Sequence, residues 1–268
     1  MIDRGRHNLL GVQIHAVDYE AAVNQIMGAA QHRRPFGVSA LAVQGVMTGV
    51  LDSEHRHRLN QLELVVPDGQ PVRWGLNLLH QIRLRDRVYG PDLMLEVCQA
   101  AAEAGVPIFF YGSTSEILER LTGNLLQKFP SLKIAGQRAS KFRQLTTQEK
   151  QEVIAEIRDS GAAITFVGLG CPRQEVFAYE FREQLQMPTL AVGAAFAFHA
   201  GKQAQAPPFM QKAGLGWLFR LAREPRRLWR RYLFLNPQYL SLLFLQKTGL
   251  KKYDVEDTQP PKSEMLYG

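Results

Sequence analysis

Short apolar runs alternate with helix-length amphipathic segments along the first 200 residues, and this alternation limits the fold more than any other feature. The run "LVV" at 64–66 ends in Pro-Asp-Gly, and helical spacing of apolar residues restarts within a few positions. Strands separated by helices pair in parallel, and the helices cover both faces of the sheet. The pattern therefore predicts an α/β, Rossmann-like core with a mostly parallel sheet.

The expected elements follow from apolar spacing and from the residues that begin and end helices. Strands are expected at 12–14, 37–43, 64–66, 106–112 and 132–137, and within 162–175 and 188–198. Helices are expected at 19–31, 46–61, 72–79, 90–105, 116–129 and 146–160. Thr146 and Glu149 have the spacing of a capping box at the start of the last of these helices.

Charge divides the chain into three parts. Residues 202–252 contain eleven Lys or Arg and one acid, whereas the chain as a whole carries +7. We therefore expect a Rossmann-like core at 8–201 and a basic, amphipathic, helical C-terminal appendage at 202–252. The polar, proline-containing residues 253–268 are expected to be disordered. Basicity concentrated in one element is typical of a protein that meets an anionic ligand or surface.

Several classes of protein are disfavoured. Two distant cysteines, Cys98 and Cys171, indicate neither a disulfide framework nor a zinc site, so no metal is expected. The N-terminus lacks the apolar segment of a signal peptide, and no window is apolar enough to span a membrane, which predicts a cytoplasmic protein. The segment "GLGCPRQE" departs from a dinucleotide fingerprint, and Walker A, GxSxG and HExxH motifs are absent.

Asp68 is the candidate acid. It follows the strand at 64–66, and ligands of open α/β sheets bind outside the carboxyl ends of the strands. The competing interpretation is that Asp68 only caps the helix that follows, which the residue pattern alone favours.

Small residues follow three other strands and could admit a phosphate. They occur in Gly112-Ser113-Thr114, Gly168-Leu169-Gly170 and Gly193-Ala194-Ala195. Glycine lets a phosphate approach the backbone, and a following helix presents unpaired N–H groups. In the appendage, arginines recur at helical spacing beside aromatic residues, a pattern suited to a membrane surface, a diphosphate or nucleic acid.

Six segments in this order resemble the WecG/TagA/CpsF glycosyltransferases, glycosyltransferase family 26. They are "LVVPDGQPVRWG", "DRVYGPDLM", "IFFYGSTSEI", "FVGLGCPRQE", "GAAFAFHAGKQAQAPPFMQKAGLGWLFRL" and "EPRRLWRRY". The resemblance covers about residues 8–245 and implies transfer, with inversion, of a hexose or N-acetylhexosamine from a UDP-sugar to a polyprenyl-diphosphate-linked saccharide. The products would enter surface polysaccharide or exopolysaccharide. A cytoplasmic protein held peripherally at the membrane, and association into homo-oligomers, are also implied; no cofactor and no nucleic acid are expected.

The resemblance also implies roles for individual residues. Asp68 would be the catalytic base, which reverses the preference for a capping role. The substrate-binding residues would be Ser39, Arg87, Gly90, Asp92, Gly112, Gly168, Gln174, Glu175, Arg220, Arg227 and Arg230.

Two departures from the family pattern put the identity of the donor sugar in question. "VSALAVQG" contains Ser39 but lacks the asparagine of a Thr-x-Asn stretch, and Gln205-Ala206-Pro207 replaces Arg-Ala-Pro. Alternatives stay open: a basic nucleic-acid- or membrane-binding module without catalysis, a nucleotide-dependent enzyme of another class, or an inactive paralogue.

Overall fold

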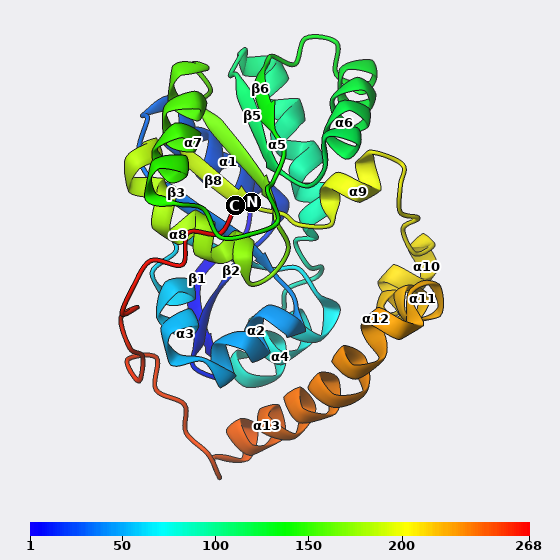
Figure 1. Ribbon diagram of the computed structural model, residues 1–268. Helices are drawn as coiled ribbons and strands as arrows, with labels where there is room; N and C mark the ends of the chain where they lie inside the picture. The colour runs from blue at the N-terminus through cyan, green and yellow to red at the C-terminus, as the bar shows by residue number, and fades with distance from the viewer.

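The computed structural model describes the backbone of residues 1–268 and every side chain except those of Arg227 and Arg231. Its centre is a six-stranded parallel sheet in the order β4-β3-β8-β7-β5-β6, which confirms the predicted fold class (Figure 1). The strands are β3 (Phe36–Leu41), β4 (Leu64–Pro67), β5 (Ile108–Gly112), β6 (Ile134–Arg138), β7 (Ile164–Gly168) and β8 (Pro188–Ala191).

Helices cover both faces of the sheet because successive strand residues point to opposite sides. In β5, Ile108 and Phe110 join one core, whereas Phe109 and Tyr111 join the other. The first face is covered by α1 (Tyr19–Gln31), α5 (Gly90–Ala104), α6 (Ser115–Lys128) and α9 (Ala195–His199). The second is covered by α2 (Val43–Leu51), α3 (Ser53–Asn60), α7 (Thr147–Asp159) and α8 (Arg173–Leu185). The capping box of Thr146 and Glu149 is present at α7.

An N-terminal hairpin was not expected in full. β1 (Asp3–Leu9) pairs antiparallel with β2 (Val12–Val17), and the hairpin packs with α4 (Gln70–His80) into the core on the second face of the sheet. The sequence predicts only residues 12–14 as a strand. Residues 3–6 are polar and exposed, so β1 lacks the apolar alternation that marks a strand.

The last two expected strands end at or close to Gly168 and Gly193, the glycines that the sequence places after them. The expected strand within 188–198 ends at Ala191, and α9 begins at Ala195. β8 stops where its pairing with Ser39 of β3 and Val167 of β7 stops, so residues beyond it have no ladder to extend. Within the segment 162–175, β7 ends at Gly168 and α8 begins at Arg173.

The basic appendage forms an arc of helices along one side of the molecule (Figure 1). It comprises α10 (Pro208–Lys212), α11 (Gly216–Arg223), α12 (Pro225–Arg230), a π-helical segment η1 (Arg231–Leu235) and α13 (Asn236–Thr248). Pro225 interrupts the single helix that the arginine spacing would need. At the far end, the Tyr239 hydroxyl of α13 donates to the Pro71 carbonyl oxygen of α4 over 2.9 Å. Among the described residues, no helix has the length and apolar character that a membrane crossing requires.

Residues 253–268, for which composition predicts disorder, return from α13 to the core (Figure 1). Backbone N–H groups of Met265 and Leu266 donate to the Glu180 carboxylate, and the buried Lys150 ammonium pairs with Glu264 at 2.7 Å. These contacts tie the last residues to α7 and α8. The appendage is therefore attached to the core at both of its ends.

Candidate functional site

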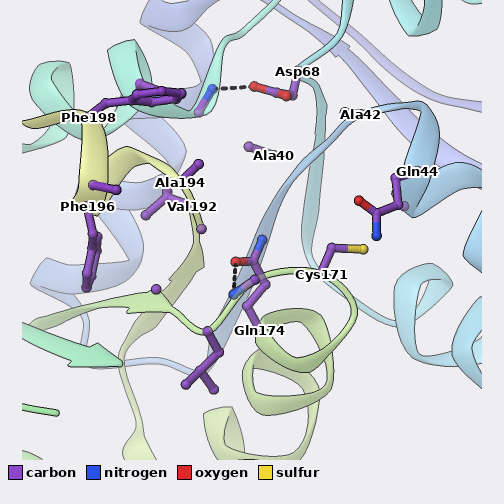
Figure 2. A pocket seen from close by; sticks show the side chains of 18 of the residues that line it. Ala40, Ala42, Gln44, Asp68, Cys171, Gln174, Val192, Ala194, Phe196 and Phe198 are labelled. Carbon is purple, nitrogen blue, oxygen red and sulfur yellow. Dashed lines mark hydrogen bonds between the residues drawn. The ribbon is translucent and has the colours of Figure 1, made fainter. Parts of the chain in front are cut away.

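A cavity of about 530 Å³ lies at the carboxyl ends of the parallel strands, and we call it the sheet-edge cavity. The segments after β3, β4, β7 and β8 all line it, as Figure 2 shows for Ala42, Asp68, Gln174 and Val192. The chain order reverses here: β4 lies on one side of β3, and β8, the last strand, on the other. Ligands of open α/β sheets bind at such a reversal.

Asp68 does not cap the helix that follows it. The N-terminal cap of α4 is Gly69, without a side-chain cap hydrogen bond. Instead, Asp68 Oδ1 accepts a 2.6 Å hydrogen bond from the Gly90 N–H at the start of α5 (Figure 2). The carboxylate thus joins two distant segments and faces the cavity, where the positive end of α5 favours its charge.

A second cavity of about 120 Å³ lies between the core and the appendage, and we call it the appendage cavity. Trp217 of α11 and Tyr232 of η1 form its appendage wall. Four polar side chains line both this cavity and the sheet-edge cavity: Gln44, Asp68, Tyr89 and Arg220. Asp68 is the carboxylate among them, so it lies where two ligands, one in each cavity, would meet.

Gln174 and Glu175 form a buried polar group in the floor of the sheet-edge cavity. Gln174 Oε1 accepts from the Gly170 N–H over 3.1 Å, and its Nε2 donates to Glu175 Oε1 over 2.9 Å. The buried Ser39 hydroxyl donates to the same oxygen over 3.4 Å, but Ser39 itself is not among the residues that line the cavity. Burial raises the pKa of Glu175, although these hydrogen bonds oppose the shift. The arrangement holds the Gly168–Gly170 turn in place.

The glycines that sequence analysis grouped together have different places. Gly90 and Gly168 line the sheet-edge cavity, whereas Gly112 is absent from the described lining. A Cβ on Gly112 would lie 2.8 Å from the Gly168 carbonyl carbon, and its φ is +111°. Gly112 therefore permits the close pairing of β5 with β7.

Arg87 and Asp92 lie toward a third cavity of about 240 Å³, which we call the side cavity. Arg87 lines both the side and appendage cavities, and its guanidinium lies 4.0 Å from the Tyr89 ring centre. Asp92 lines only the side cavity among the three. Burial and the Asp68 charge raise the pKa of Tyr89, so its phenol stays neutral.

Of the three predicted appendage arginines, Arg220 and Arg230 lie in different places. Arg220 lines both cavities that Asp68 lines. Arg230 is exposed beside the Trp229 ring, and it lines none of the three cavities. Arg227 lies in α12, but its side chain is outside the described residues.

Sequence analysis missed several residues of the site. Gln44, in the first turn of α2, faces the cavity beside Cys171 (Figure 2). Tyr89 lies within the quoted "RVYGPD", and Phe198 comes from the segment expected to be a strand. The position of Gln44 soon after β3 was a usable signal, whereas Tyr89 lies directly before α5. Within the described side chains, no group of His, Cys, Asp or Glu is placed to hold a metal ion.

Comparison with known proteins identifies the family to which this chain belongs. The family model described as "Glycosyl transferase WecG/TagA/CpsF family" matches residues 7–253. An N-acetylglucosaminyldiphosphoundecaprenol N-acetyl-beta-D-mannosaminyltransferase of Bacillus spizizenii is 29% identical over 72% of this chain and 73% of its own length. A protein of the same description from Bacillus subtilis is 26% identical over 78% of this chain and 80% of its own. The chain belongs to the WecG/TagA/CpsF family of glycosyltransferases.

Proposed function

We propose that this glycosyltransferase moves a hexose or N-acetylhexosamine from a UDP-sugar to a polyprenyl-diphosphate-linked saccharide, with Asp68 as the general base. The observation that carries the proposal is the position of Asp68 on the boundary of the sheet-edge and appendage cavities. The relatives named above act on a lipid-diphosphate-linked sugar, which supports this class of acceptor.

The geometry supports a single displacement. A donor in the sheet-edge cavity would present its anomeric carbon to an acceptor hydroxyl in the appendage cavity. As the hydroxyl oxygen attacks, its proton passes to Asp68, and the bond to the nucleoside diphosphate breaks on the opposite side of the carbon, which inverts it. Arg220, which lines both cavities, supplies positive charge for the developing diphosphate.

Apolar side chains on the appendage support contact with a membrane surface. The outward-facing set has exposed fractions of 40% or more and consists of Phe209, Leu215, Leu218, Trp229, Leu233, Phe234, Leu240, Phe244 and Leu250. It is combined with the eleven bases of residues 202–252. Apolar residues beside Lys and Arg are typical of helices that lie in a membrane interface. Such contact would bring the appendage cavity to a lipid-linked acceptor.

The first test is acceptor-dependent UDP release with a panel of UDP-sugars and membrane-extracted lipid acceptors. Asp68→Asn keeps an oxygen that can accept from Gly90 N–H, so the fold should be retained. Loss of the base should lower turnover about 100- to 10,000-fold. Asp159→Asn, at an exposed carboxylate at the end of α7, is the matched control and should leave turnover unchanged.

Equal turnover of Asp68→Asn and the original protein would show that Asp68 is not the general base. Absence of release with every donor and acceptor, in protein that binds anionic vesicles or RNA, would favour an inactive paralogue or a binding module.

A further inference from the structure

Tyr89 lies at the boundary between the sheet-edge and appendage cavities and lines both of them. It is the N-terminal cap of α5, directly before Gly90, whose N–H donates to Asp68. The Tyr89 N–H donates to the Tyr19 hydroxyl over 2.9 Å. Side chains from two distant parts of the chain therefore accept from two consecutive N–H groups here, which fixes the backbone of Tyr89 next to Asp68.

The ring of Tyr89 is also fixed in place. The Arg87 guanidinium lies over it, 4.0 Å from the ring centre, a contact that is electrostatically favourable. Arg87 in turn donates from Nη2 to Gln211 Oε1 of α10 over 2.9 Å. The orientation of the tyrosine is thus set before a ligand binds, as electrostatic stabilisation of a transition state requires.

The hydroxyl of Tyr89 is a neutral hydrogen-bond donor. Burial raises the pKa of this phenol, and the negative charge of Asp68 adds to the shift. The charges of Arg87 and Arg220 oppose it, whereas that of Asp92 supports it. The side chain is only half-buried, and within the described part of the chain no residue accepts a hydrogen bond from its hydroxyl. The hydroxyl can therefore donate to a ligand.

The sheet-edge cavity has little positive charge for a diphosphate. Arg220 is the single cation among the described side chains that line it. As the bond between sugar and nucleoside diphosphate breaks, negative charge develops on the leaving oxygen, and fixed neutral donors can stabilise it together with a cation. Of the uncharged polar side chains that line both cavities, Gln44 and Tyr89, the phenol is the more acidic group and so the stronger donor.

We propose that Tyr89 is a further catalytic residue, whose hydroxyl donates a hydrogen bond to the diphosphate oxygen that leaves the sugar. The electron pair of the broken C–O bond goes to this oxygen, and the proton of the acceptor hydroxyl goes to Asp68. Tyr89 keeps its own proton and stabilises the charge that the leaving oxygen gains. The assignment rests on the proposed function.

The first test is Tyr89→Phe in the full chain, which removes the hydroxyl and keeps the ring under Arg87. The kcat should fall about 10- to 1000-fold, as loss of one donor to a developing oxyanion does, and the acceptor KM should stay unchanged. The affinity for UDP, measured by calorimetry, should fall about tenfold, the loss of one hydrogen bond to a charged group. Tyr179→Phe is the matched control, because Tyr179 is a half-buried tyrosine of α8 that lines none of the three cavities.

Replacement of Tyr89 by 3,5-difluorotyrosine separates a donor from a side chain that only packs. The fluorinated phenol ionises at lower pH, and a phenolate cannot donate, so the basic limb of the kcat–pH profile should move to lower pH. An unchanged basic limb would overturn the proposal, as would equal kcat and UDP affinity of Tyr89→Phe and the original protein. A higher acceptor KM at unchanged kcat would also overturn it, because the hydroxyl would then contact the acceptor. If the original protein neither binds nor releases UDP, the proposed function itself is contradicted, and this assignment with it.

Discussion

At the scale of single residues, Gly112 provides a prediction that separates packing from ligand binding. A Cβ at Gly112 would contact the Gly168 backbone at 2.8 to 3.1 Å, and φ at this position is +111°. Gly112→Ala should therefore lower the free energy of unfolding by about 2 kcal/mol or more, as strain at such a backbone position does. Chemical denaturation with urea measures the change.

Gly123→Ala is the matched control. Gly123 lies inside α6, and its added Cβ would meet nothing within 4 Å. Because alanine favours a helix, this change should raise stability by up to about 1 kcal/mol. Equal effects of the two substitutions would show that the close approach of Gly112 to Gly168 is not what requires glycine.

At the level of single residues, the sequence identified part of the candidate site. The position of Asp68 after a strand, and the resemblance around Gln174, pointed to side chains that do line the sheet-edge cavity. Gly112 and Asp92 were grouped with them, but Gly112 packs against β7 and Asp92 lines the side cavity. Sequence spacing indicates which strand ends meet, but it does not indicate which atoms face the space between them.

At the scale of secondary-structure elements, the apolar face of η1 provides a test of membrane contact. Leu233 is 57% and Phe234 65% exposed, and both lie within the basic appendage. Replacing both with serine should reduce sedimentation with anionic vesicles about tenfold or more, since each large apolar side chain buried contributes about 1.5–3 kcal/mol. Leu126→Ser, at a 42% exposed leucine of α6, should leave sedimentation unchanged.

Sedimentation that is equal in the double variant and the original protein would place the membrane contact elsewhere. If the double variant also fails to release UDP from the donor when a water-soluble acceptor analogue is supplied, η1 also shapes the appendage cavity, which Tyr232 lines.

Elements were predictable where local signals and tertiary pairing agree. The helix expected at 19–31 matches α1, with Asp18 accepting from the Ala21 N–H at its start. β1 was missed because its exposed residues carry no periodic signal. β8 ends at Ala191, two residues before the glycine that marks its expected end, because its pairing with β3 and β7 ends there. Arginine spacing alone did not show that the helix is broken, and Pro225 separates α11 from α12.

At the scale of the whole molecule, buried histidines predict how stability depends on pH. Burial lowers the pKa of His15 and of His55 to about 4 each. In the unfolded chain both groups have a pKa near 6.5. Between about pH 6.5 and 4 the unfolded state therefore binds protons that the native state does not, so stability falls as pH falls through this range. Glu175 and Glu180 contribute the opposite pH dependence. Burial raises their pKa values, so their contribution to stability falls as pH rises.

His55→Gln isolates one of these contributions. At pH 5, a shift from about 6.5 to about 4 corresponds to roughly 2 kcal/mol of lost stability for His55. Between pH 7.5 and 5, the urea-derived free energy of unfolding of the variant should therefore fall by about 2 kcal/mol less than that of the original protein. His32→Gln, at an exposed histidine after α1, is the matched control. Comparing the two pH values within each variant cancels any effect of the substitution on packing, so an identical fall in His55→Gln and the original protein would show that His55 does not stay neutral in the folded core.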